Sequence, residues 1–156
     1  MKRIVIILLL FAITYLSSLY VFHFVSSLFL FDKIEYVKVI RVIDGDTFEI
    51  ENKEKVRLIG IDTPEIREKC YLEAKQRLKD LVENKTVKLV KDKKDRDKYG
   101  RLLRYVFVND TFVNLVLVKE GYAFVYFDNV NVRYLEELVQ AEKYAKENKI
   151  GCLWKD

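Results

Sequence analysis

The stretch from residue 44 to residue 65 carries the side chains best suited to chemistry. Among its side chains are the carboxylates Asp44, Asp46, Asp62 and Glu65 and a single arginine, Arg57. Asp46 and Asp62 lie 16 residues apart, each within a turn-forming sequence, DGD and DTP. If the intervening strands fold back on themselves, the two turns meet. Carboxylate oxygens brought together in this way bind hard cations such as Ca²⁺ or Mg²⁺.

Arg57 is flanked by apolar residues in the sequence VRLIGI. An arginine in such surroundings is costly unless an anion lies opposite it, and its planar guanidinium pairs with phosphate in a bidentate manner. The stretch therefore suggests a metal site beside a phosphate site. The alternative is that DGD and DTP are ordinary solvated turns, because Asp, Gly and Pro all favour turns.

Four short motifs, DGDT, VRL, IDTPE and DKYGR, follow one another along the chain. Their order resembles that of the staphylococcal nuclease (thermonuclease) family, from about Val37 to Trp154. Four motifs in one order are much more specific than any single motif. The resemblance implies that Asp46 and Asp62 bind Ca²⁺ through their carboxylates and Thr63 through its backbone carbonyl.

The resemblance also assigns catalytic and substrate-binding residues. Glu65 would act on the attacking water, as general base or as its positioner, and Arg57 and Arg101 would bind the phosphoryl oxygens. The residues expected to hold the nucleotide are Lys98, Tyr99 and Tyr126, with Phe127 as the alternative to Tyr126. Without the resemblance, the charge-rich segment 91–101 is most simply a solvated loop. In the best-known family member the loop after the glutamate is longer and lysine-bearing, whereas here only IREK separates Glu65 from Cys70.

The function implied is a calcium-dependent nuclease. It would hydrolyse phosphodiester bonds in DNA and RNA, single-stranded or locally opened, to give 3′-phosphate products, and would act as a monomer. Two alternatives remain: a non-catalytic module that binds nucleic acid or protein, and a membrane-anchored structural domain. The sequence does not choose between DNA and RNA as the physiological substrate.

Hydrophobic periodicity predicts the elements that position these residues. Alternation of period two predicts three strands between Glu35 and Ile61, and two more at TVKLV and RLLRYVFV. Helical periodicity begins at Tyr71 and runs out near Asn84. A short helix is expected from Phe112 to Lys119, ended by a glycine, and a last helix runs to about residue 148, capped by Asn131. This order fits an α+β fold, a partly open five-stranded OB-fold barrel with three helices.

The N-terminal region is expected to form a separate segment, residues 1–31, ahead of a nuclease-like domain, residues 32–156. Residues 4–31 contain no charged side chain, and this length is sufficient for a transmembrane helix. We interpret the run as an uncleaved single-pass anchor, and a cleaved signal peptide is the alternative. The charges flanking the run do not decide its orientation. The basic start resembles a secretory signal, which favours an extracytoplasmic domain.

The net charge and the cysteine content constrain the possible functions less than the motifs do. Without Lys2 and Arg3, the remainder has 26 Lys and Arg against 24 Asp and Glu, too balanced to indicate nucleic-acid binding. The two cysteines, Cys70 and Cys152, fit no zinc motif. An extracytoplasmic location would permit a disulfide, but two buried free thiols fit the sequence as well.

Overall fold

The computed structural model describes residues 13–22 and 34–155. The chain divides into two units, residues 1–33 and Ile34–Asp156. In the first unit, residues 13–22 are helical with exposed side chains. Most of the expected membrane anchor, residues 4–31, lies outside the described residues, and within the described parts of the chain no helix is long and apolar enough to cross a membrane. The anchor therefore stays a prediction.

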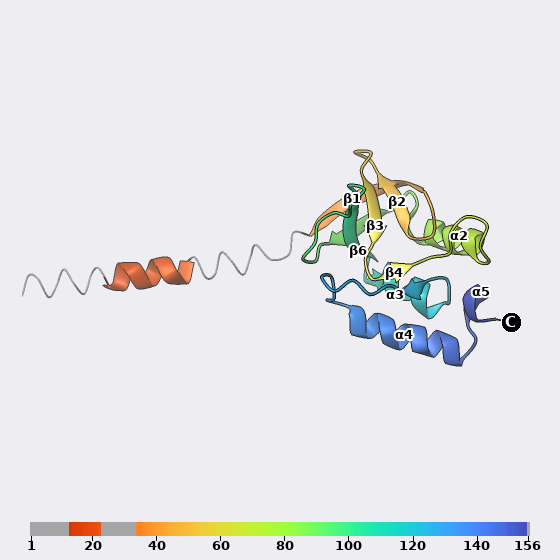
Figure 1. Ribbon diagram of the computed structural model, residues 1–156. Helices are drawn as coiled ribbons and strands as arrows, with labels where there is room; N and C mark the ends of the chain where they lie inside the picture. The colour runs from red at the N-terminus through yellow and green to blue at the C-terminus, as the bar shows by residue number, and fades with distance from the viewer. Residues whose placement is uncertain (1–12, 23–33, 156) are drawn as a thin grey trace, which may run out of the picture. The chain divides into compact units, whose positions relative to one another are not determined.

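Five strands of the second unit form a closed barrel (Figure 1). They are β1 (Glu35–Val42), β2 (Thr47–Ile50), β3 (Lys55–Leu58), β5 (Thr86–Val90) and β6 (Leu102–Val108). β1 pairs antiparallel with β2 and β5, β2 with β3, and β5 with β6. A parallel pairing of β3 with β6 completes the ring. The expected OB-fold α+β class is confirmed, but the prediction of a partly open barrel was wrong because β3 and β6 lie side by side.

Three two-residue strands supplement the barrel. β4 (Ile61–Asp62) pairs with β8 (Phe124–Val125), and β7 (Thr111–Phe112) pairs with the end of β6. Strands this short carry too little alternation to be recognised in a sequence. The β4–β8 pair nevertheless matters for the site, because it places the DTP turn beside residues 124–127.

Four helices accompany the barrel, namely α2 (Tyr71–Val82), α3 (Val113–Lys119), α4 (Leu135–Glu147) and α5 (Gly151–Trp154). α3 packs against α4, β6 and α2, and α4 also contacts β8 (Figure 1). The first three helices were predicted, whereas the single-turn α5 was not. Asn131 does not cap α4, because the N-cap is Tyr134 and the Asn131 side chain is buried, accepting a hydrogen bond from the Lys94 backbone N–H at 2.9 Å.

The core fills the barrel and continues beneath the helices. Its fully buried side chains include Val39, Phe48, Ile50, Val56, Leu58, Leu89 and Val106 from the strands, and Leu78, Leu117 and Leu138 from the helices. Each such side chain contributes about 1.5 to 3 kcal/mol by leaving water. The burial of these apolar side chains therefore stabilises the barrel and helices that carry the candidate site.

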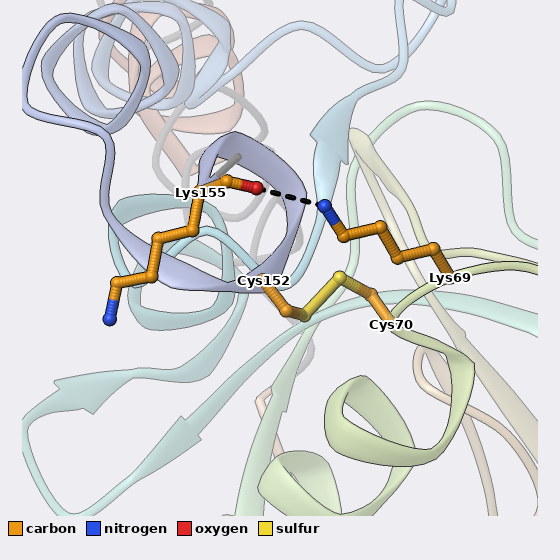
Figure 2. Close-up of a disulfide and its surroundings, with 4 residues drawn as sticks. All are labelled: Lys69, Cys70, Cys152 and Lys155. Carbon is orange, nitrogen blue, oxygen red and sulfur yellow. Dashed lines mark hydrogen bonds between the residues drawn. A yellow bond between two sulfur atoms is a disulfide. The ribbon is translucent and has the colours of Figure 1, made fainter.

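Cys70 and Cys152 form a disulfide, with their Cα atoms 5.6 Å apart (Figure 2). The sequence had left this pairing open, and the fold decides it by bringing the start of α2 against α5. The bond closes a loop with a sequence separation of 82. In the chain-entropy description a loop of this size stabilises the folded state by about 4.5 kcal/mol.

Candidate active site

Three neighbouring strands position most of the candidate residues. In the strand register Thr47 of β2 is the partner of Arg57 of β3, and Arg57 is in turn the partner of Leu103 of β6. Asp46 directly precedes β2, and Arg101 directly precedes β6. The closed barrel therefore places residues that are far apart in the sequence at one place on its surface.

The DGD and DTP turns meet, as their spacing suggested. The backbone N–H and the Oγ1 hydroxyl of Thr63 both donate to Asp46 Oδ2 at 3.1 Å. A Cβ added at Gly45 would lie 2.6 Å from Thr63 Oγ1. Only glycine permits so close an approach of the two turns. The close packing of the turns therefore explains why the middle residue of DGD is glycine.

Arg57 connects the two predicted metal ligands. Its Nε lies 3.0 Å from Asp46 Oδ1, and its Nη2 lies 2.7 Å from Asp62 Oδ1. Its Nη1 donates to the carbonyl oxygens of Leu58 and Ile61 at 2.7 and 2.8 Å. The arginine side chain is 13% exposed, so these contacts compensate the burial of its charge. The carboxylates of Asp46 and Asp62 thus both contact one positively charged group, the guanidinium of Arg57.

Asp46 is the most perturbed acid of the site. The pKa of Asp46 is raised to about 6. Burial is the largest cause of this rise, the positive charge of Arg57 opposes it, and the like charge of Asp44 adds to it. Its Oδ1 also accepts a hydrogen bond from Thr47 Oγ1 at 2.9 Å. A buried carboxylate with a raised pKa is an acceptor that gains from a cation brought close to it.

Arg101 is held by Asp97 and linked to Asp46 through Thr47. Its Nε donates to Asp97 Oδ2 at 2.6 Å, and its Nη1 donates to Thr47 Oγ1 at 3.3 Å. Burial alone would raise the pKa of Asp97, but hydrogen bonds from the side chain and backbone of Arg101 and from the Tyr99 N–H hold that pKa below its usual range. Asp97 therefore stays ionised and fixes the direction of the arginine.

A pocket of about 530 Å³ opens beside these groups. Of the nine predicted site residues, six line it: Arg57, Asp62, Lys98, Tyr99, Arg101 and Tyr126. Asp46 and Thr63 do not line it and lie behind Arg57 and Asp62. The pocket thus has a cationic wall formed by two guanidinium groups.

Aromatic side chains border the same pocket and are exposed to solvent. Tyr99, Tyr126 and Phe127 are 72%, 57% and 61% exposed. Lys98 Nζ and Arg101 Cζ lie 5.0 and 5.5 Å from the centre of the Tyr99 ring. Exposed aromatic faces beside cationic groups are the arrangement that binds unstacked bases and their phosphates.

Glu65 lies apart from the pocket lining. It stands in an exposed loop between the buried Pro64 and the buried Cys70. Its backbone N–H donates to Glu68 Oε2 at 2.7 Å, and its carbonyl accepts from the Glu68 N–H at 2.9 Å. Within the described residues its carboxylate forms no ion pair. This side chain is therefore available to a water or to a ligand.

The donor set at Asp46, Asp62 and Thr63 fits a hard cation. Across the residues that the structure describes, no three His, Cys, Asp or Glu side chains gather as a ready metal cluster. The two aspartates nevertheless converge on one positive group, the Arg57 guanidinium, and the Thr63 backbone adjoins both. Two carboxylates, a carbonyl and waters form an irregular oxygen set, which Ca²⁺ accepts more readily than Mg²⁺ does.

Two residues of the site were not singled out from the sequence. Thr47 and Asp97 lie inside the DGDT and DKYGR motifs, so the motifs contained the signal, but their roles as bridge and support need the contacts with Arg101. Phe127 lines the pocket next to Tyr126. Its aromatic type was visible in the sequence, but the direction of its side chain was not.

Comparison with known proteins agrees with this geometry. Residues 55–156 match the family described as Staphylococcal nuclease homologue. The chain is 39% identical over 121 residues to the Thermonuclease of Staphylococcus hyicus, covering 72% of each chain. It is 38% identical over 133 residues to Endonuclease YncB of Bacillus subtilis, covering 78% of this chain and 63% of the relative. A protein of Methanocaldococcus jannaschii named Uncharacterized protein MJ1439 is 38% identical over 151 residues, covering 76% of this chain and 71% of the relative.

Proposed function

Because this chain belongs to the staphylococcal nuclease family, we propose that it is a calcium-dependent nuclease of DNA and RNA. The family and the relatives named as nucleases support a nuclease activity at the general level. The metal, the substrate and the product, a 3′-phosphate, are the finer parts of the proposal.

The observation that carries the proposal is the pocket bordered by Arg57 and Arg101. Two guanidinium groups, each oriented by a carboxylate, can donate to phosphate oxygens through the N–H groups that their protein contacts leave over. A volume of about 530 Å³ lies in the usual range of small-molecule pockets and exceeds what one phosphate needs. The extra space and the exposed rings of Tyr99 and Tyr126 suit a nucleotide whose base is not stacked in a duplex. This favours single-stranded or locally opened substrates.

In the proposed reaction the two arginines bind the scissile phosphate and stabilise the negative charge that grows on its oxygens. Glu65, from its exposed loop, holds the attacking water or accepts its proton. Lys98 lies beside Tyr99 and would pair with a phosphate of the bound chain, while Tyr99 and Tyr126 hold the sugar or base. The 5′ oxygen leaves, and the phosphate remains on the 3′ side.

Asp46, Asp62 and the Thr63 carbonyl would hold the calcium ion. When bound, the ion supplies charge neutralisation at a phosphate oxygen and lowers the pKa of a coordinated water. The buried Asp46 gains most from this, because its negative charge is the least solvated of the site.

One assay tests the proposed activity. The full chain should degrade single-stranded DNA and RNA in Ca²⁺, degrade them much more slowly in Mg²⁺, and be inactive in a chelator, because Mg²⁺ requires near-octahedral geometry and releases its waters slowly. Gel analysis with end-labelled oligonucleotides gives the rates and identifies the 3′-phosphate ends. Equal cleavage in Mg²⁺ would contradict the metal assignment, and nucleotide binding without cleavage would favour a non-catalytic module.

We also propose that the chain is a membrane-anchored monomer with its domain outside the cytoplasm. The support for the anchor is the uncharged run of residues 4–31, and the support for the extracytoplasmic side is the basic start, which resembles a secretory signal. Full-length protein expressed in a bacterium should stay in the membrane fraction through a carbonate wash, and protease added to spheroplasts should remove the domain. A soluble mature form beginning near Leu28 would instead identify a cleaved signal.

A further inference from the structure

The loop that carries Glu65 has few attachments of its own. Residues 65–69 are exposed, and the backbone enters the left-handed region at Arg67 and again at Cys70, with φ values of 79° and 77°. Within the described residues, one hydrogen bond runs from this segment to a residue beyond Tyr71, from Lys69 Nζ to the Lys155 carbonyl oxygen at 2.8 Å. The position of Glu65 therefore depends on what fixes the two ends of the loop.

The C-terminal end of the loop is fixed by the disulfide. Cys70 is 3% exposed and precedes the first residue of α2, and its sulfur is bonded to Cys152 in α5. Figure 2 shows Lys69 extending to Lys155 beside the disulfide, so two neighbouring residues of the loop end reach the same C-terminal segment. Both attachments hold the loop to α5.

α5 is in turn fixed to the strand pair that carries Asp62. The Leu153 N–H donates to the Gly121 carbonyl at 3.2 Å, and a Cβ on Gly121 or Gly151 would overlap the backbone of the other segment. The Trp154 ring packs edge-on against Phe124, with ring centres 5.4 Å apart.

Phe124 of β8 is the strand partner of Asp62 in β4. Asp62 and Glu65 are therefore joined in two ways, through the backbone of residues 63 and 64 and through Cys70, Cys152, Trp154 and Phe124. The disulfide is the covalent link in the second connection.

We propose that the Cys70–Cys152 disulfide positions Glu65 relative to Asp62, so that full turnover requires the oxidised chain. The inference rests on the proposed nuclease function. Neither cysteine touches the substrate in this account, so both are positioning residues. A dithiol reductant would supply two electrons and two protons, breaking the S–S bond to give two thiols while the dithiol closes to its own cyclic disulfide.

The test uses the full chain and the double substitution Cys70→Ser with Cys152→Ser. At a temperature below the melting transitions of both proteins, kcat on single-stranded DNA in saturating Ca²⁺ should fall about 10-fold or more, since small displacements of a catalytic group have effects of this size. The KM should change less than about twofold, because the pocket lining does not include the loop.

A second background separates positioning from general destabilisation. In Glu65→Gln protein, removing both cysteines should change the residual rate by less than about twofold, since the group being positioned has already lost its function. Leu89→Ala, in the buried face of β5, is the matched control: it should lower the Tm while leaving kcat within about twofold.

If the double variant fails to fold, Lys69→Ala provides the same test with the disulfide intact. Lys69 is exposed, and its loss removes the other attachment to the C-terminal segment. Its kcat should fall severalfold in the parent and stay unchanged in the Glu65→Gln background. Parent-like kcat without the disulfide, or an equal loss in the Glu65→Gln background, overturns the inference and leaves the nuclease proposal standing. Absence of any calcium-dependent cleavage by the oxidised parent overturns both.

Discussion

Replacing Arg101 by alanine should lower kcat on single-stranded DNA about 100-fold or more, comparable with the loss of one donor from an oxyanion site. The reason is that Asp97 and Thr47 hold this guanidinium at the edge of the pocket, where charge on the phosphate grows as the reaction proceeds. Affinity for a short oligonucleotide should weaken much less, because ground-state phosphate still contacts Arg57. Single-turnover kinetics and fluorescence anisotropy measure the two effects separately.

Arg41→Ala is the matched control for loss of one positive charge. Arg41 is exposed on β1 and pairs with Glu49 at 2.9 Å, and it does not line the pocket. Its removal should leave kcat unchanged within about twofold. If Arg101→Ala cleaved at the parent rate, the catalytic assignment of this arginine would be wrong even in a working nuclease.

Asp46→Asn should inactivate the protein and remove a pH dependence from its stability. The substitution removes one of the two carboxylates proposed to hold calcium, and loss of several kcal/mol of charge stabilisation corresponds to a rate decrease of about 100-fold or more. Calorimetric titration should show weakened Ca²⁺ binding. Without calcium, the Tm of the parent should fall as the pH rises from about 4 to 8, and this part of the fall should be absent in the variant.

The sign of the stability change follows from the pKa of Asp46. Burial raises that pKa to about 6 from an unfolded value near 3.8, so the folded chain binds the proton more tightly. The stabilising contribution of the protonated form is complete below about pH 4 and is lost as pH rises through about 6. Above that pH the ionised carboxylate costs up to about 3 kcal/mol relative to its protonated form. Asparagine does not titrate and lacks this pH-dependent cost, although its amide NH2 group meets the donors from which Asp46 accepts. Thermal unfolding of both proteins in chelator from pH 4 to 8 measures the pH dependence.

Asp62→Asn is the contrasting variant. Asp62 pairs with the same arginine, but its side chain is 54% exposed, whereas that of Asp46 is 8% exposed. It should lose calcium-dependent activity but keep the parent's pH dependence of Tm, because a solvated carboxylate carries little desolvation cost. Loss of that pH dependence in both variants would show that the burial of Asp46 is not its cause.

The sequence by itself determined most of the local elements and indicated the candidate residues of the site. Alternation of period two was enough to find β1, β2, β3, β5 and β6, and helical periodicity found α2, α3 and α4, because each of these elements buries one face and the pattern records it. The four motifs supplied eight of the nine candidate site residues in chain order, and Tyr126 lies outside them. The two-residue strands β4 and β8 and the single-turn helix α5 were missed because each spans only about one repeat of its pattern.

Only the tertiary structure decided how distant segments meet. The parallel β3–β6 pairing closes the barrel and places Arg57 and Arg101 at one pocket, and nothing local to either strand encodes that contact. The sharing of Arg57 between Asp46 and Asp62 comes instead from the antiparallel β2–β3 pairing and from the short connection between β3 and β4. The disulfide also depends on distance in space, since Cys70 and Cys152 have a sequence separation of 82 and come within bonding reach only when α5 packs near the start of α2. The local hydrophobic pattern indicates which face of a helix or strand is buried. Which other element covers that face depends on the packing of the whole domain.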